Sequence, residues 1–253
     1  MSPSRAAGAR EKTPKVDTST SRPTKGEETR ARILETALAL FLQRGYEQTT
    51  MRAIAEQASV AIGNAYYYFE SKEHLIQAFY GRTHREHLEA TAPILAKEKG
   101  FRERLLGVMY AKLDTIEQYH RFSGVLFRTA ADPNSPLNPF SAESAAVRDE
   151  STALFRSVVE GSTARIPDDL RAELPRLLWI YHMGVILYWI HDTSRGRERS
   201  RRLVEQTVDL IARLVALGSN PVLRPIRRSV LRLIAETAGA SAGPGGVSRS
   251  RRS

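Results

Sequence analysis

The sequence contains no cysteine, which excludes disulfide bonds, thiolate catalysis and cysteine-ligated metal sites. Its N-terminus is basic and polar with no apolar stretch behind it, so we expect no signal peptide. The longest uncharged apolar run, residues 177–190, is too short to span a bilayer and is better explained as a buried helix. These absences favour a cytoplasmic protein with no membrane partner.

The sequence also lacks the patterns that carry most enzyme chemistry. It has no Ser-His-Asp arrangement, no glycine-rich phosphate loop and no His/Asp/Glu cluster with metal-ligand spacing. His84 and His87 are a weak exception, but Arg85 and Glu86 lie between them, and we interpret the pair as part of a solvated helix face. The sequence therefore predicts no catalytic residues, no metal site and no cofactor.

No stretch alternates apolar and polar residues as a β-strand does, so the sequence predicts an all-α fold. The segment 132–141 contains three prolines and is predicted to be a loop. Beyond residue 83, apolar residues recur at steps of three and four in seven segments: 84–98, 101–119, 121–131, 143–161, 168–193, 200–217 and 222–237.

Positive charge is concentrated at the two ends of the chain. The formal net charge is +10; residues 1–26 hold six Lys/Arg against two acidic residues, and residues 239–253 hold three Arg and no acid. Both ends are rich in Ser, Pro, Gly and Ala, which predicts disordered basic tails. These tails either attract phosphates non-specifically or only keep the chain soluble. Between them we expect an N-terminal domain, 27–83, and a helical domain, 84–238.

Three short helices and the start of a fourth are predicted within residues 27–83. The first has apolar residues at helical spacing, and Gly45 suits the position just after its end. Thr49 or Thr50 is the predicted N-cap of the second. A tight break at residues 59–61 leads to the third. A short helix, a tight turn and another short helix form the helix-turn-helix pattern.

The segment "IGNAYYYF", residues 62–69, forms the third predicted helix. A helical wheel places Ile62, Ala65 and Phe69 inward, Tyr66 at the edge, and Gly63, Asn64, Tyr67 and Tyr68 outward. An outward face of Gly, Asn and Tyr suits the DNA major groove, where amides and hydroxyls bond base edges. Lys72, at the start of the next helix, suits a phosphate. On the wheel alone, an ordinary protein contact explains these tyrosines equally well.

The stretch "TRARILETALALFLQRGYEQTTMRAIAEQASVAIGNAYYYFESKEHLIQAF" resembles the TetR-type (tetracycline-repressor-like) transcription regulators. It contains the "A-x-x-L-F-x-x-x-G-Y", "T-x-x-x-I-A", "G-N-x-Y-Y-x-F" and "S-K-x-x-L" motifs at the spacing of that family. The resemblance implies a double-stranded DNA operator as partner. It also implies a DNA-binding set, in which the first three members bind phosphates and the others face or flank the bases: Thr50, Tyr66, Lys72, Gly63, Asn64, Tyr67 and Ile62.

The sequence departs from the family pattern at three positions. Ser59 stands where the family usually has Gly, at a position expected to need positive φ, which costs about 1 kcal/mol. Ala61 replaces the usual Ser cap of the third helix, also at a cost of about 1 kcal/mol. Asn64 is then free either to cap that helix or to read a base. Ile62 replaces a frequent basic residue and removes one contact to DNA.

The resemblance further implies that the last two long helices form a four-helix interface in a homodimer. Residues 168–193 are apolar on nearly all sides in their second half, and such a helix must be covered all round. A second subunit would cover the outer face, with residues 200–217 supplying the other half of the interface. A monomer with a larger core is the alternative.

The same resemblance implies a cavity for a small, largely apolar effector. Each of six candidates either lines this cavity or belongs to the ordinary core: Tyr110, Phe122, Phe127, Trp179, His182 and Met183. The predicted function is a ligand-released repressor that binds a near-palindromic operator as a homodimer. The alternative is a helical enzyme or small-molecule carrier with a vestigial DNA-binding domain, and an assay for binding to duplex DNA separates the two.

Overall fold

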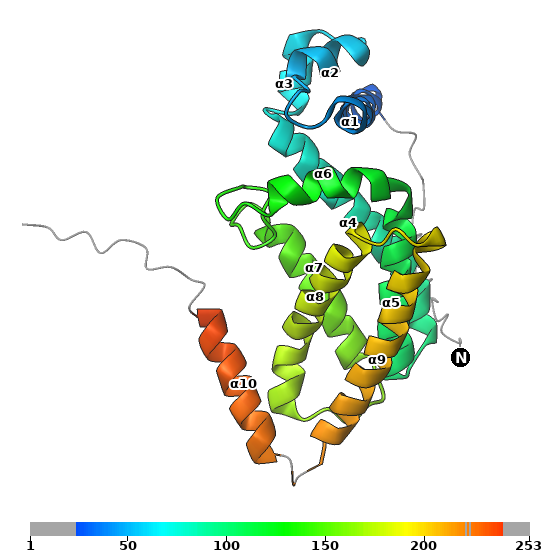
Figure 1. Ribbon diagram of the computed structural model, residues 1–253, viewed down its shortest axis with the longest axis vertical. Coiled ribbons are helices and arrows are strands. Elements are labelled where there is room, and N and C mark those ends of the chain that lie inside the picture. Colours follow the sequence, from blue (N-terminus) through cyan, green and yellow to red (C-terminus); the bar gives the residue numbers. More distant parts are fainter. Residues whose placement is uncertain (1–23, 221, 223, 240–253) are drawn as a thin grey trace, which may run out of the picture.

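The computed structural model describes residues 24–220, 222 and 224–239. This described part of the chain forms ten α-helices and no strand, which confirms the all-α prediction (Figure 1). None of these helices is long and apolar enough to cross a membrane. The helices are α1 (Lys25–Arg44), α2 (Met51–Gln57), α3 (Ile62–Tyr68), α4 (Lys72–Lys97), α5 (Phe101–Ile116), α6 (His120–Ala130), α7 (Ala145–Glu160), α8 (Asp168–Ile190), α9 (Glu198–Gly218) and α10 (Arg224–Gly239).

The predicted basic tails, 1–26 and 239–253, lie almost wholly outside the described residues. At the inner edge of the first, α1 already begins at Lys25, so the predicted tail extends too far. Thr24 caps the helix in a reciprocal pair with Glu27. The Thr24 hydroxyl accepts the Glu27 N–H at 3.3 Å, and the Glu27 carboxylate accepts the Thr24 N–H at 2.7 Å. A capping box therefore fixes where the first helix starts.

Helices α1, α2, α3 and the first turns of α4 enclose one apolar core. Ile33, Ala37 and Phe41 are fully buried, as the helical spacing of α1 predicts. Gly45 ends α1 with a φ of 85°, a conformation that favours glycine. Tyr46 then folds back, so that its ring centroid lies 5.2 Å from that of Phe41. These contacts hold the short helices α2 and α3 against the two longer helices.

The turn between α2 and α3 contains a residue in a left-handed conformation. Ser59 has a φ of 54°, the positive value that its place in the family motif predicts. A side chain with a Cβ atom crowds the backbone there. The turn is therefore strained by the absence of glycine.

Replacing Ser59 with glycine should stabilise the fold by about 1 kcal/mol, because glycine adopts this φ without strain. Urea denaturation of the full chain measures the change. Ser71→Gly is the matched control: Ser71 has an extended φ of −156°, so glycine there relieves nothing and should be neutral or destabilising. Equal effects of the two substitutions would contradict the strain.

Helix α4 runs from this N-terminal core into a bundle formed by α5, α7, α8 and α9 (Figure 1). The bundle has its own core, in which Leu105, Phe155 and Trp189 are fully buried. Helix α6 crosses between the two parts. On its inner side, Phe122 stacks against Phe41 of α1 at 6.0 Å between ring centroids and meets Phe79 of α4 edge-on at 5.5 Å. Helix α6 therefore belongs to the core of the N-terminal helices although it follows α5 in the chain.

The prediction that His84 and His87 form a solvated face is wrong. Their side chains are only 3% and 2% exposed, because this face of α4 packs against α5 and α7. His87 shares a hydrogen bond of 2.9 Å between Nε2 and the Val108 carbonyl. His84 lies 3.3 Å from the Ser151 hydroxyl through Nδ1. The charged residues between the two histidines point elsewhere on the helix and gave no information about this face.

Helices α8 and α9 carry large apolar side chains that the described part of the chain does not cover. The most exposed of them are Ile180, Leu187, Tyr188, Leu210, Leu214 and Leu217, all between 40 and 55% exposed. Helix α10 lies beside α8 and is attached through Arg227, whose Nε is 3.1 Å from the Asp169 carboxylate. An apolar groove of about 460 Å³ lies between α8, α9 and α10.

Candidate functional sites

The first candidate site lies at the helix-turn-helix, at the end of the molecule formed by α2 and α3 (Figure 1). Thr50 is the N-cap of α2, and its hydroxyl accepts the N–H of Ala53 at 3.2 Å. The side chain is exposed, so the same hydroxyl retains its hydrogen as a donor. Thr49, the other predicted cap, is buried and donates to the Gly45 carbonyl at 2.8 Å. The geometry thus leaves Thr50 facing solvent at a helix N-terminus.

Helix α3 exposes every residue of the predicted DNA-facing set that it carries. Tyr67 is 81% exposed, Tyr66 49% and Ile62 41%, and Gly63 and Asn64 are also exposed. This face has no charged side chain. It can therefore offer amide and hydroxyl groups and apolar carbon to a partner, which are the groups that read base edges and thymine methyls.

The predicted orientation of α3 was wrong for two residues. Tyr68 was placed outward but is partly buried against the N-terminal core, whereas Ile62 was placed inward and is exposed. The wheel treated Phe69 as helical, but Phe69 has a φ of −145° and a ψ of 107° and lies beyond the helix end. When Phe69 is left out of the helical wheel, Ala65 and Tyr68 define the inward side, and the outward side is centred nearer to Tyr66 and Tyr67.

Gly63 is not required by the fold itself. A Cβ atom at this position would meet no other atom within 4 Å, and the residue has no positive φ. The N-cap of α3 is Ala61, which has no side-chain cap bond, as its replacement of Ser predicts. Asn64 makes no side-chain hydrogen bond within the described residues, so it does not substitute as the cap. Both Gly63 and Asn64 are therefore available to a partner.

Lys72 lies at the first position of α4, partly buried against Tyr46. Its Nζ donates to the Tyr46 carbonyl at 2.8 Å and lies 4.3 Å from the centroid of the Tyr46 ring. An ammonium has three N–H donors, so this bond leaves others for a second acceptor. The contact with Tyr46 fixes the direction of the lysine side chain. Thr50 and Lys72 thus provide two donors, at the N-termini of α2 and α4, on either side of α3 in the sequence.

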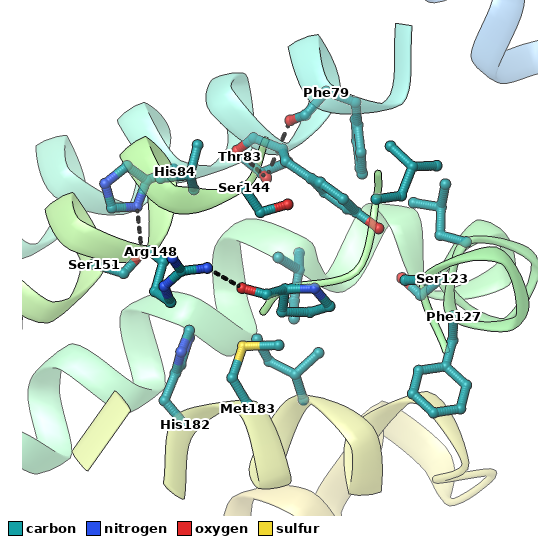
Figure 2. Close-up of a pocket in the computed structure, with 18 of the residues that line it drawn as sticks. Phe79, Thr83, His84, Ser123, Phe127, Ser144, Arg148, Ser151, His182 and Met183 are labelled. Atoms are coloured by element: carbon teal, nitrogen blue, oxygen red, sulfur yellow. Dashed lines mark hydrogen bonds between the residues drawn. The ribbon is translucent and has the colours of Figure 1, made fainter. Parts of the chain in front are cut away.

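The second candidate site is a cavity of about 270 Å³ between α4, α5, α6, α7 and α8. Figure 2 shows its lining. Four of the six predicted effector contacts line it, namely Phe127, Trp179, His182 and Met183. The other two lie elsewhere: Phe122 faces the N-terminal core, and Tyr110 lies beneath Arg201 of α9, with 5.7 Å between the guanidinium carbon and the ring centroid.

The cavity has one polar end. There His84 lies 3.3 Å from both the Ser151 hydroxyl and the Glu150 carboxylate. His182 is 5% exposed, and neither of its ring nitrogens has a hydrogen-bond partner in the part of the chain that the structure describes. Burial lowers the pKa of His182 well below its usual value and that of His84 in the same direction. Both imidazoles are therefore neutral near pH 7.

The polar end also contains a lysine that sequence reasoning missed. Lys112 of α5 lines the cavity and is only 9% exposed. Burial lowers the pKa of its ammonium to about 8, and the nearby Glu86 acts in the opposite direction. The pattern of α5 contains the signal, because Lys112 interrupts an apolar stripe that includes Leu105, Met109 and Ile116. A lysine on the inward stripe of a helix either pairs or faces a cavity.

Comparison with known protein families matches both parts of this chain. Residues 33–79 match the model "Bacterial regulatory proteins, tetR family", and residues 104–233, half of the chain, match "Tetracyclin repressor-like, C-terminal domain". The chain belongs to the TetR family. This TetR family consists of DNA-binding regulators of transcription, and membership assigns the chain to that class rather than to an enzyme family.

Among curated TetR-family relatives, the transcriptional repressor KstR of Mycolicibacterium smegmatis is 41% identical over 91 residues, which are 36% of this chain and 44% of that protein. KstR2 of Mycobacterium tuberculosis is 33% identical over 99 residues, 36% of this chain and 46% of that protein. The chain thus spans less than half the length of either repressor.

Solved structures of TetR regulators share the fold. One from Syntrophomonas wolfei superposes with a TM-score of 0.61 at 18% identity and covers 74% of this chain and 96% of its own. The fatty acid degradation regulator FadR from Bacillus halodurans gives 0.59 at 16% identity, with coverages of 74% and 96%. At these identities the likeness extends to the TetR fold alone.

Proposed function

We propose that this TetR-family protein is a homodimeric repressor that binds a near-palindromic operator and is released from it by a small, largely apolar effector. The observation that carries the proposal is the face of α3, where Tyr67 is 81% exposed and the neighbouring glycine has no role in packing. A solvated helix gains nothing from such an aromatic, uncharged face, whereas the major groove offers it partners.

The apolar face of α8 and α9 supports the homodimer. Ile180 and Leu187 of α8 and Leu214 of α9 are each at least 40% exposed. Gly184 lies on the same side of α8, where a Cβ would meet no atom within 4 Å, so a second helix can approach closely. Self-association across a two-fold axis would cover this face and impose two-fold symmetry on the bound DNA.

Helices α4 and α6 connect the cavity with the N-terminal core that holds α3, and this connection supports release by an effector. Phe79 of α4 and Leu126 of α6 line the cavity, and both belong to the core that holds α1, α2 and α3. Arg82 of α4 also pairs with Glu35 of α1. A ligand that shifts α4 or α6 would therefore move the two helix-turn-helix units of the dimer relative to each other.

Selection of bound duplexes from random DNA tests the proposal. We expect enrichment of an inverted repeat, which then serves as the operator in binding assays at fixed salt. Enrichment of no sequence, with equal affinity for all duplexes, would favour the alternative of a small-molecule-binding protein with a vestigial DNA-binding domain.

Gly63→Ala should separate DNA reading from folding. Alanine has the higher helix propensity, so the substitution should leave stability unchanged or raise it by up to about 1 kcal/mol. The added methyl group would stand between the backbone of α3 and the bases, so operator affinity should fall by about 1–3 kcal/mol per protomer. Urea denaturation and a mobility-shift titration provide the two measurements. Unchanged operator affinity would place this face of α3 outside the DNA contact.

A further inference from the structure

The polar end of the cavity holds a buried positive charge without a partner. Lys112 is nine-tenths buried, and no hydrogen bond or ion pair of its ammonium is found among the described residues. Even with its pKa lowered to about 8, most of this lysine is protonated at pH 7. A buried ion that lacks a counter-charge destabilises the fold, so the site favours an anion.

A second buried group at this end lacks an acceptor. A neutral imidazole has one N–H donor, yet neither nitrogen of His182 has a partner among residues 24–220, 222 and 224–239. Its ring stacks on that of His87, 6.0 Å away between centroids, and the ring of Phe155 packs against it at 5.5 Å in a tilted arrangement. The packing fixes the ring, and the orphaned donor is aimed into the cavity that His182 lines. Buried donors of this kind are normally satisfied by a ligand or water.

The acidic groups near this end are already paired or peripheral. Glu86, the carboxylate that acts to raise the pKa of Lys112, lies 3.8 Å from the Arg82 guanidinium. Glu150 lies 3.3 Å from His84 and is 63% exposed. Glu143 also lines the cavity. Arg148 provides a second positive charge there, and the Nη1 of Arg148 donates to two loop carbonyls. The charges that line the cavity therefore sum to a positive value.

Away from this end the wall is mostly apolar, although Ser123 lies beside Phe127. Figure 2 shows His84, Ser151 and His182 at one end and Phe127 at the other. Between and around them lie aliphatic and aromatic side chains, including Ile116, Leu126, Trp179, Ile186, Trp189 and Ile190. The site thus combines a cationic, donor-rich end with a hydrocarbon-lined channel.

We infer that the effector is an apolar carboxylic acid, with its carboxylate between Lys112 and His182 and its hydrocarbon part toward Phe127. This inference rests on the proposed function only in taking the cavity as the effector site. A carboxylate supplies both a counter-charge and an acceptor, and charge-assisted bonds of this kind are the stronger ones. A neutral alcohol would satisfy only His182, and an amine would place a like charge against Lys112.

Binding of three molecules with the same hydrocarbon chain tests the inference: decanoic acid, decan-1-ol and decylamine, each below its micelle concentration. Both tryptophans of the sequence line the cavity, so intrinsic fluorescence of the full-length protein reports occupancy. At pH 7 we expect the acid to bind at least about tenfold more tightly than the alcohol. The amine should not bind.

Lys112→Met removes the charge while keeping the length of the side chain. We expect it to lower the affinity for decanoic acid to that for decanol and to leave decanol binding unchanged. The matched control is Lys97→Met, which removes the same charge from an 83% exposed side chain and should alter neither affinity. Equal binding of acid and alcohol to the unsubstituted protein, or an equal loss of both in Lys112→Met, would overturn the inference.

A parallel operator titration keeps this inference separate from the proposed function. If decanoic acid binds through Lys112 but the protein recognises no DNA sequence, the ligand class stands and the repressor function fails. If the operator is bound and only neutral or cationic molecules enter the cavity, the repressor function stands and the carboxylic acid is excluded.

Discussion

Replacing Leu214 with glutamate is expected to convert the protein into monomers and to reduce its affinity for the full operator by about 10²–10⁴-fold. Leu214 is 55% exposed on α9, within the apolar face that α8 and α9 share. In the proposed dimer this side chain is buried against the second subunit, where an unpaired carboxylate is costly. Each monomer then binds one half-site alone and lacks the additional operator affinity that a dimer has because its two DNA-binding domains are linked.

Sedimentation velocity at micromolar concentration measures the oligomeric state, and a mobility-shift titration on the full operator measures affinity. The matched control is Leu42→Glu, which changes a leucine of similar exposure, 48%, on α1. The control should remain dimeric. If Leu214→Glu also remains dimeric, then α8 and α9 are not the interface, and the monomer or another arrangement takes precedence.

Replacing Phe122 with alanine should destabilise the protein by about 3–5 kcal/mol, because it removes a fully packed aromatic ring and leaves a cavity. Phe122 is 1% exposed and is the contact through which α6 joins Phe41 of α1 and Phe79 of α4. Urea denaturation measures the loss. The result also decides between two interpretations of this residue, since an effector contact on a cavity wall would tolerate truncation with little change in stability.

Tyr67→Ala serves as the comparison for Phe122→Ala. Tyr67 is 81% exposed and contacts chiefly the ring of Tyr68, with 5.1 Å between centroids. Its truncation should cost about 1 kcal/mol or less. A loss for Phe122→Ala no greater than this would mean that α6 is not anchored to the N-terminal core.

Patterns within single helices could be read from the sequence, and contacts between distant helices could not. The buried face of α1 follows from local periodicity and the proline-rich loop from the fixed φ of proline, whereas the positive φ of Ser59 was expected from its place in the TetR motif. The burial of His84 could not be predicted, because it depends on α7, more than sixty residues further along the chain. Lys112 lay on a readable apolar stripe, but only the fold shows that the stripe faces a cavity.

The interpretation of α3 failed for a related reason. A helix of seven residues makes only two turns, so one wrongly included residue rotates the apparent inward direction. Phe69 is buried like a helical core residue, yet it has an extended backbone. Its burial therefore says nothing about the face of α3, and the exposure of Ile62 and the partial burial of Tyr68 emerged only from the structure.

The buried histidines make folding of this protein a proton-releasing process in mild acid. Burial lowers the pKa of His87 to about 3 and that of His182 well below the ordinary 6.5. Below pH 6.5 the unfolded chain takes up protons at these two residues that the folded chain refuses. Above pH 6.5 these histidines do not lower the free energy of unfolding. As the pH falls from 6.5 toward the folded pKa values, the free energy of unfolding declines by about 1.4 kcal/mol per pH unit for each histidine. Acidification alone would therefore destabilise the folded protein, without any ligand or DNA.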